Sequence, residues 1–171
     1  ESWRDPLTNL LNRRGLQKVA SHEMIRIAEE GETMAVMMMD VDEFKNINDR
    51  LGHDVGDAIL EFIGRAIQNQ CRAGDILCRL GGDEFLVALP SAGIEIAHRR
   101  GEALRAVVAD LGPLRDRFPE LTVTLSVGIA VSPKDGSDWD EIVAAADTAL
   151  YQAKRAGRDR IAAKSDPLQP L

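Results

Sequence analysis

Apolar residues along this chain follow helical spacing in some stretches and form short continuous runs in others. A first helix is predicted from four apolar residues at helical spacing: Leu16, Val19, Ala20 and Ile27. Thr8 is a suitable cap before this helix, and Gly31 is a suitable end. Residues 34–39 are instead continuously apolar, which is typical of a central buried strand. This strand leads directly into Asp40 and Asp42.

A second amphipathic helix and a hairpin follow. The helix begins near Asp54 and places four apolar residues on one face: Ile59, Ile63, Ala66 and Ile67. Residues 76–80 and 85–89 have the composition of two strands. Glycine in the intervening residues 81–84 supplies the positive φ values that a tight hairpin turn needs. The tip of this hairpin is therefore Gly-Gly followed by two acids.

Three more elements are predicted before the chain ends. Residues 94–111 form a helix, and residues 122–131 form a strand rich in β-branched residues. Ser137 or Asp138 caps a last helix, which ends at Gly157.

The resulting order, α-β-α-β-β-α-β-α, predicts the fold class. A strand, a helix, a hairpin, a helix and a strand form the ferredoxin-like split βαβ arrangement of an α/β (α+β) domain, with the helices packed on one face of the sheet. We expect one domain over residues 1–164 and a flexible tail over residues 165–171.

Bulk properties exclude several classes of protein. The chain has 171 residues, 44% of them apolar, which is enough for one domain with a core. Its formal net charge of −7 argues against binding nucleic acid or a membrane surface by charge alone. Cys71 and Cys78 match neither a zinc nor a redox spacing, so reduced thiols are expected. No apolar run reaches the ~20 residues that cross a bilayer, which favours a cytoplasmic domain, although segments outside this chain could anchor the whole protein.

Acidic residues gather where the first strand and the hairpin are expected to meet. Asp40 and Asp42 share a face if the strand continues that far, and a neighbouring hairpin brings Asp83 and Glu84 close to them. Three or four carboxylates at one sheet end repel one another unless a cation lies among them. Mg²⁺ suits such a site, because it takes one or two carboxylates and completes its octahedron with water and phosphate oxygens. The alternative is that these acids are solvated residues of strand ends and turns.

Polar residues of several kinds follow the first acids. Lys45, Asn48, His53 and Asp57 crowd a loop and a helix start. This variety suits recognition of a base and phosphates better than solvation alone.

Five ordered blocks together resemble one family. Gly81-Gly82-Asp83-Glu84-Phe85 is the signature that gives the GGDEF-domain diguanylate cyclase family its name. Residues 5–14, 40–49, 52–57 and 146–158 resemble its other motifs, in the same order. Asn9 and Asp159 depart from the residues that are usual at their positions, and these departures bear on local turns only.

The resemblance implies a metal-dependent cyclase. Asp40 and Asp83 would bind Mg²⁺, or Mn²⁺, through their side chains, with the Val41 carbonyl assisting and two cations in each half-site. Two copies of the domain would face each other, each holding one GTP, and condense them into cyclic di-GMP with release of two pyrophosphates. A homodimer would therefore be needed for catalysis, and an upstream sensory or dimerisation domain is expected outside this chain.

The resemblance also implies substrate contacts. Asn48 and Asp57 would read the guanine edge, since a carboxylate accepts from N1–H and the exocyclic amine while an amide donates to an acceptor on the base. The nucleotide site would include seven further residues: Phe44, Lys45, His53, Gly81, Gly82, Lys154 and Arg158. Lys45 would act in catalysis, and the general base stays open between Asp83 and Glu84.

Simpler interpretations of these residues remain. Asn48 can cap a helix, His53 can be an ordinary loop residue, and Lys154 and Arg158 can compensate a helix dipole.

Arg72 and Asp75, shortly before the signature, match the family's Arg-x-x-Asp product-inhibition site. An arginine there can pair with phosphate and stack on guanine while the carboxylate reads the base edge. The alternative is a helix-ending turn with exposed charges.

Two other hypotheses compete with an active diguanylate cyclase. One is a module that only senses GTP or cyclic di-GMP, and the other is an enzyme for a different nucleotide. The intact signature argues against the first, and Asp57 against the second. No nucleic acid partner and no direct membrane contact are expected.

Overall fold

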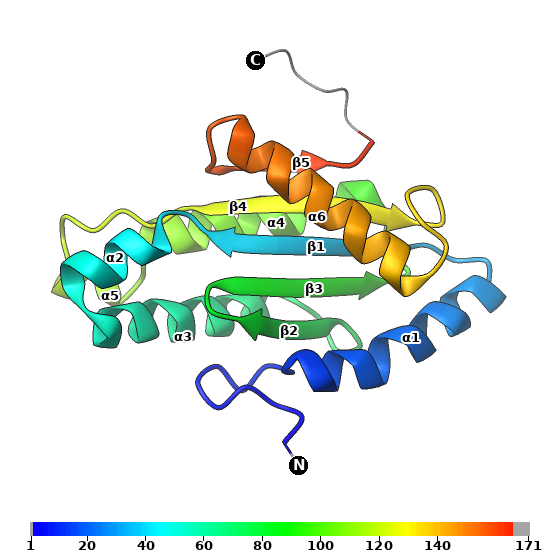
Figure 1. Cartoon of the computed structure of the whole chain (residues 1–171), viewed down its shortest axis with the longest axis horizontal. Helices are drawn as coiled ribbons and strands as arrows, with labels where there is room; N and C mark the ends of the chain where they lie inside the picture. Colours follow the sequence, from blue (N-terminus) through cyan, green and yellow to red (C-terminus); the bar gives the residue numbers. More distant parts are fainter. Residues whose placement is uncertain (1, 166–171) are drawn as a thin grey trace.

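A computed structural model describes residues 2–165 of the chain, as one sheet between helices (Figure 1). The strands are β1 (Met34–Val41), β2 (Ile76–Gly81), β3 (Glu84–Pro90), β4 (Leu125–Ser132) and β5 (Arg160–Ala163). The helices are α1 (Arg13–Glu29), α2 (Phe44–Leu51), α3 (His53–Gln70), α4 (Ile94–Asp110), α5 (Leu114–Arg117) and α6 (Trp139–Arg155). No helix among residues 2–165 is long and apolar enough to cross a membrane.

The sheet has the order β2-β3-β1-β4-β5. β1 pairs in antiparallel fashion with β3 on one side and with β4 on the other, and β2 and β3 form the predicted hairpin. These strands confirm the ferredoxin-like split βαβ arrangement. β5 adds a parallel strand beside β4 and was not predicted, because its four residues are too short a pattern to recognise.

Helices cover both faces of the sheet, so the expectation of helices on one face is wrong. Figure 1 shows α6 in front of the sheet and α4 behind it. Ala35, Met37 and Met39 of β1 belong to the core that also contains residues of α3 and α4. Met34 and Met38 belong to the core formed with α1 and α6. Burial of β1 on both faces explains its continuous apolar run, because a strand covered on both faces needs apolar side chains at every position.

The first helix begins later than predicted. Asn12 is its cap, and the Asn12 side chain accepts a hydrogen bond from the backbone N–H of Gly15. Thr8 lies instead in a preceding turn, where its N–H and hydroxyl both donate to the Asp5 carboxylate at 2.8 Å. The short helices α2 and α5 were also not predicted. Of the predicted tail, residues 166–171 lie outside the described residues, and Ser165 donates a hydrogen bond to Asp135.

Close packing of α6 on β4 determines where the end of this helix lies. A Cβ atom at Gly128 of β4 would lie 2.1 Å from the Leu150 nitrogen and 2.3 Å from the Ala146 oxygen. Only glycine therefore allows this approach of helix and strand backbones. The last turn of α6 is thus brought down to the end of the sheet where β1 terminates.

Candidate active site at the acidic end of the sheet

Asp40 is a buried carboxylate near the end of β1. It lies opposite Glu84 of β3 and Ser126 of β4 in the strand register. Because side chains alternate along a strand, Asp40 faces the α6 side, as Met38 does. There it pairs with Lys154 in the last turn of α6. Register and helix packing therefore bring together residues from both ends of the chain.

Asp83 lies at the tip of the β2–β3 hairpin, held against β1. Gly81 and Gly82 have φ values of 142° and 52°, which glycine adopts without strain. The Val41 N–H donates to the Asp83 carbonyl at 3.3 Å. Arg79 holds the turn from the other side, since its Nε and Nη2 donate to the Gly82 carbonyl at 3.0 and 2.8 Å.

The charges at this sheet end are out of balance. Burial raises the pKa of Asp83 to about 7, with a further contribution from the Asp40 carboxylate and a smaller opposing effect of Lys154. Burial lowers the pKa of Lys154, but Asp40, Asp83 and Glu84 more than offset this and raise it. One ammonium thus faces several carboxylates, which is an environment that favours a further cation.

A buried oxygen supports the same conclusion. Oδ1 of Asp40 has no hydrogen-bond partner among the described residues, although it is inaccessible to solvent. A buried carboxylate oxygen is costly unless a donor or a metal satisfies it. Asp40 and Asp83 therefore fit a Mg²⁺ site that completes its coordination with backbone, water and phosphate oxygens.

The Asp42 carboxylate does not join the three that act on Lys154, which are those of Asp40, Asp83 and Glu84. Residues 2–165 contain no group of three or more His, Cys, Asp or Glu side chains arranged to hold a metal ion. Hydroxyl groups of Thr124 and Ser126 engage the Asp42 carboxylate instead. Of the two acids in the Asp-x-Asp pattern, Asp40 is therefore a metal candidate and Asp42 has another role.

The candidate base-recognition residues lie on two successive helices. Asn48 of α2 rests on Gly56 of α3, where a Cβ atom would meet Asn48 Oδ1 at 1.9 Å. This Oδ1 is buried and has no hydrogen-bond partner among the described residues. Asn48 is not a helix cap, since the residues at the cap positions are Glu43 and Gly52. Asp57 is exposed one residue beyond Gly56.

The remaining predicted residues lie around this end of the sheet with different degrees of exposure. Lys45 is 91% exposed and lies 3.9 Å from Asp49, so its ammonium group is available to a ligand. His53 is exposed at the start of α3. Arg158 follows α6, and its Nε lies 3.7 Å from a carboxylate oxygen of Glu43.

A second charged site lies between the end of α3 and α4. Asp75 is 1% exposed, and its Oδ2 accepts from the Arg72 N–H at 2.9 Å and from Arg100 Nη1 at 3.2 Å. Arg72 Nη2 donates to the Pro90 carbonyl at 2.9 Å. Arg72 and Asp75 form the turn that the simpler interpretation expected, but the Asp75 carboxylate is buried and not exposed. Arg72 also borders a groove, and the product-inhibition site stays a prediction.

This groove has a volume of about 260 Å³ and is lined by Arg72, Ile96, Arg99 and Arg100. Sequence reasoning missed Arg99 and Arg100. They lie on α4, and no local pattern relates them to Arg72.

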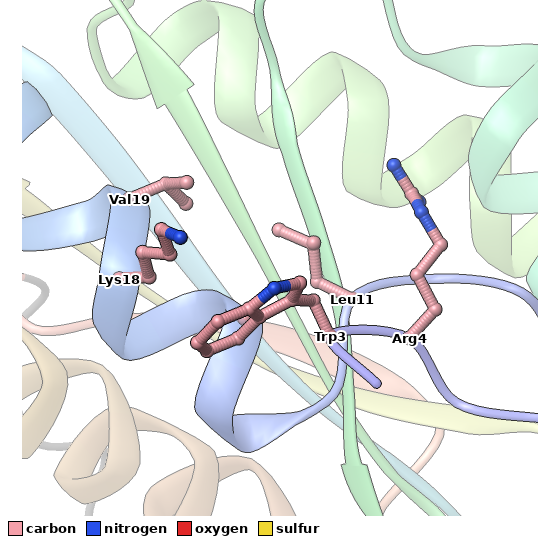
Figure 2. Close-up of a pocket in the computed structure, with 6 residues that line it drawn as sticks. Trp3, Arg4, Leu11, Lys18 and Val19 are labelled. Atoms are coloured by element: carbon pink, nitrogen blue, oxygen red, sulfur yellow. The ribbon is translucent and has the colours of Figure 1, made fainter. Parts of the chain in front are cut away.

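A separate groove of about 340 Å³ lies beside the first turns of α1 (Figure 2). Trp3 and Leu11 are among the residues that line it, and the ammonium group of Lys18 lies 4.3 Å from the Trp3 ring. Its lining comes from the N-terminal segment and α1, not from the elements that carry Asp40 and Asp83.

Asp5 fastens the N-terminal segment to the signature hairpin. Arg79 Nη1 donates to both of its carboxylate oxygens, at 3.0 and 3.2 Å, and both side chains are 14% exposed. Burial raises the pKa of Asp5, but hydrogen bonds from Thr8 and the Arg79 charge outweigh burial, so the net shift is downward from 3.8. The ionised form of Asp5 is therefore the one that stabilises the fold.

Asp5→Asn is expected to lower the free energy of unfolding by about 1–2 kcal/mol at pH 7. A depressed pKa stabilises the fold above pH 3.8 and loses this effect as pH falls through the lower folded-state value. Urea unfolding of both proteins between pH 7 and pH 3 measures this difference. Asp116→Asn, an exposed acid, is the matched control. If the free energies of unfolding of the wild type and Asp5→Asn differ equally at pH 7 and pH 3, the stabilising role of ionised Asp5 is contradicted.

Fold and site together define a class. A ferredoxin-like domain that presents two carboxylates and a lysine at one sheet end, beside polar residues of a helix pair, is suited to a metal–nucleotide ligand. Residues 2–160 match the family described as "Diguanylate cyclase, GGDEF domain". The chain belongs to this family.

Relatives of known sequence agree with this assignment. Diguanylate cyclase DgcP of Pseudomonas aeruginosa is 39% identical over 158 residues, covering 92% of this chain and 23% of the relative. Diguanylate cyclase DosC of Escherichia coli is 36% identical over 157 residues, covering 92% and 34%. The chain thus spans about a quarter to a third of the length of these curated relatives.

Solved structures agree as well. The GGDEF domain of DgcB from Caulobacter crescentus, in complex with c-di-GMP, has a TM-score of 0.88 at 28% identity, with 97% of this chain and 98% of that chain covered. The GGDEF domain of TpbB, or YfiN, from Pseudomonas aeruginosa has a TM-score of 0.87 at 35% identity, with 95% and 94% covered.

Proposed function

We propose that this chain is the catalytic domain of a diguanylate cyclase that condenses two GTP molecules into cyclic di-GMP and two pyrophosphates. The observation that carries this proposal is the pairing of buried Asp40 with Asp83 and Lys154 at the signature hairpin. An acidic site of this kind binds a triphosphate only with the help of cations, which accounts for nucleotide binding by a chain with a net charge of −7.

Asp40 and Asp83 hold Mg²⁺ or Mn²⁺ through their side chains, and the Val41 carbonyl assists. Two ions per half-site, when bound, neutralise the triphosphate and stabilise charge on the attacking and leaving oxygens. The unpartnered Oδ1 of Asp40 supports this role. The general base is one of the two signature acids, Asp83 or Glu84.

Guanine recognition is the role of Asn48 and Asp57. The exposed Asp57 carboxylate supports this role, because guanine presents donors that a carboxylate can accept. The Asn48 amide nitrogen would donate to an acceptor on the base. Adenine lacks this pair of donors at the same edge. His53, at the start of α3, lines the base side of the site.

The phosphates bind between α2, the hairpin and the end of α6. No described side chain caps α2, so the first backbone N–H groups of this helix, at Phe44 and Lys45, can receive an anion. Gly81 and Gly82 allow the turn to approach the nucleotide without side-chain obstruction. Lys154 and Arg158 supply positive charge.

Catalysis requires a second copy of the domain, because each site holds one GTP and each 3′-hydroxyl attacks the other α-phosphate. Cyclic di-GMP binds back at Arg72 and Asp75, where Arg99 and Arg100 add positive charge to the groove. A partner protein could supply the input to this activity. A similar structure, diguanylate cyclase SiaD with its activator SiaC, is one such case in another protein.

Dilution of the purified protein is expected to lower its specific activity. With GTP and Mg²⁺, cyclic di-GMP formed per domain should fall in proportion to concentration below the dimer dissociation constant, because one copy carries half a site. Chromatographic product analysis from tens of micromolar to tens of nanomolar protein measures this effect.

GTP binding by the same samples is the control, since a single domain binds GTP at every dilution. Binding without product at any concentration would support a sensor module instead. A mixed ATP and GTP reaction that yields adenine-containing product would support a different nucleotide enzyme.

A further inference from the structure

Asp42 has different partners from Asp40, although the sequence pattern places both in one acidic cluster. Asp42 is 8% exposed. Its Oδ1 accepts from the Ser126 hydroxyl at 2.6 Å, and its Oδ2 accepts from the Thr124 hydroxyl at 2.7 Å. The backbone N–H of Asp159 donates a third hydrogen bond to Oδ2, at 3.0 Å. Three donors therefore satisfy this buried carboxylate without a cation.

The third donor belongs to a turn with an unusual backbone. Arg158 and Asp159, which follow α6, are consecutive non-glycine residues with φ values of 64° and 48°. Side chains disfavour this left-handed conformation, and it persists only where surrounding contacts hold it. The turn begins at Gly157, whose φ is 122°.

Two elements hold Asp159 in this conformation. Asp42 accepts from its N–H, and Arg105 of α4 donates to its carbonyl at 2.5 Å and to its carboxylate at 2.8 Å. Asp42 is more buried than Arg105, and its hydroxyl partner Ser126 anchors it to β4. The Asp42 side chain therefore fixes the position of the turn relative to the end of β1.

The conformation of this turn sets the direction of the Arg158 side chain. Its guanidinium extends toward Glu43, with Arg158 Nε 3.7 Å from Glu43 Oε1, and both side chains are about half exposed. Glu43 directly precedes α2, whose N terminus faces the phosphates in the proposed function. A small rotation at Asp159 would carry the Arg158 charge away from this position.

We propose that Asp42 is a positioning residue that fixes the Arg158–Asp159 turn, and thereby aims the Arg158 guanidinium at the GTP phosphates. Asp42 is not a metal ligand. The inference rests on the proposed function, because it assigns Arg158 a phosphate contact.

A binding assay tests this inference separately from catalysis. Calorimetric titration with a non-hydrolysable GTP analogue and Mg²⁺ is the measurement. Arg158→Ala is expected to weaken binding about tenfold, and Asp42→Ala by nearly as much. In the double variant, Asp42→Ala should add less than about twofold, since both changes remove one interaction.

Asp42→Asn provides the conservative variant. An amide oxygen can still accept from the Asp159 N–H, and the amide nitrogen can donate to the Ser126 hydroxyl. Binding should therefore return to within about threefold of the wild type. Loss of Mg²⁺-dependent binding in Asp42→Asn, as for a metal ligand, would overturn the inference.

Thr124→Val addresses the possibility that Asp42→Ala fails to fold. It removes one hydroxyl partner without changing charge, and it should weaken binding about threefold in the wild type but not in Arg158→Ala. Equal effects in both backgrounds would sink the inference. If Arg158→Ala binds like the wild type, the phosphate assignment and the inference fail together. If all variants bind as expected but no cyclic di-GMP forms, only the proposed cyclase activity fails.

Discussion

Asp40→Asn and Asp83→Asn are each expected to lower cyclic di-GMP formation by at least about a thousandfold, because an amide replaces a carboxylate that is proposed to hold the cations. Product analysis at saturating GTP and Mg²⁺ measures the loss. Asp140→Asn, which changes an exposed acid in the first turn of α6, should retain activity. Turnover within tenfold of the wild type in either variant would contradict the metal assignment.

The fold should survive the change at Asp83. Burial and the Asp40 carboxylate raise the pKa of Asp83 to about 7, so the folded state binds the proton more tightly than the unfolded chain does. The ionised Asp83 carboxylate therefore destabilises the folded state fully above pH 7, and this effect is absent below pH 3.8. Asparagine carries no such penalty, and thermal unfolding without metal at pH 8 should show a variant at least as stable as the wild type.

Arg72→Ala is expected to raise the cyclic di-GMP concentration needed for half-inhibition by at least about tenfold, since a guanidinium proposed to bind phosphate is lost. The backbone N–H of Arg72 still donates to Asp75 in this variant, so the turn itself should remain. Initial rates at increasing added product measure the change. Arg65→Ala is the matched control, because Arg65 is an arginine that is 63% exposed on the neighbouring helix α3.

Uninhibited rates should be nearly equal in the wild type and Arg72→Ala. Inhibition that is unchanged in Arg72→Ala would show that the groove beside α4 is not the inhibitory site. A parallel loss of uninhibited activity would instead indicate that Arg72 supports the catalytic site.

Local sequence determined the elements that carry the chemistry. The run before Asp40 is a strand because its continuous apolar character suits burial on both faces. The signature is a hairpin tip because Gly81 and Gly82 take up backbone angles that other residues avoid. Asn9 and Asp159, noted as departures, both have positive φ, which explains why their positions suit glycine or asparagine.

Local sequence was misleading where tertiary contacts compete with propensity. Thr8 has the chemistry of a helix cap, but its hydroxyl donates to Asp5, and Asn12 caps α1 instead. The continuous apolar run already required cover on both faces, although the fold class was predicted with helices on one face.

The sequence by itself determined the longer helices, the strands β1 to β4 and which acids lie at strand ends, because spacing and backbone preference act over a few residues. Only the tertiary structure decided how those acids divide their roles. Lys154 meets Asp40 across 114 positions, and the Asp159 N–H meets Asp42 across 117. Such pairs depend on strand register and on the close approach of α6 at Gly128. Strand register and this helix packing leave no periodic signal in the sequence. The different roles of Asp40 as a metal candidate and Asp42 as a positioning residue therefore emerge only in the folded protein.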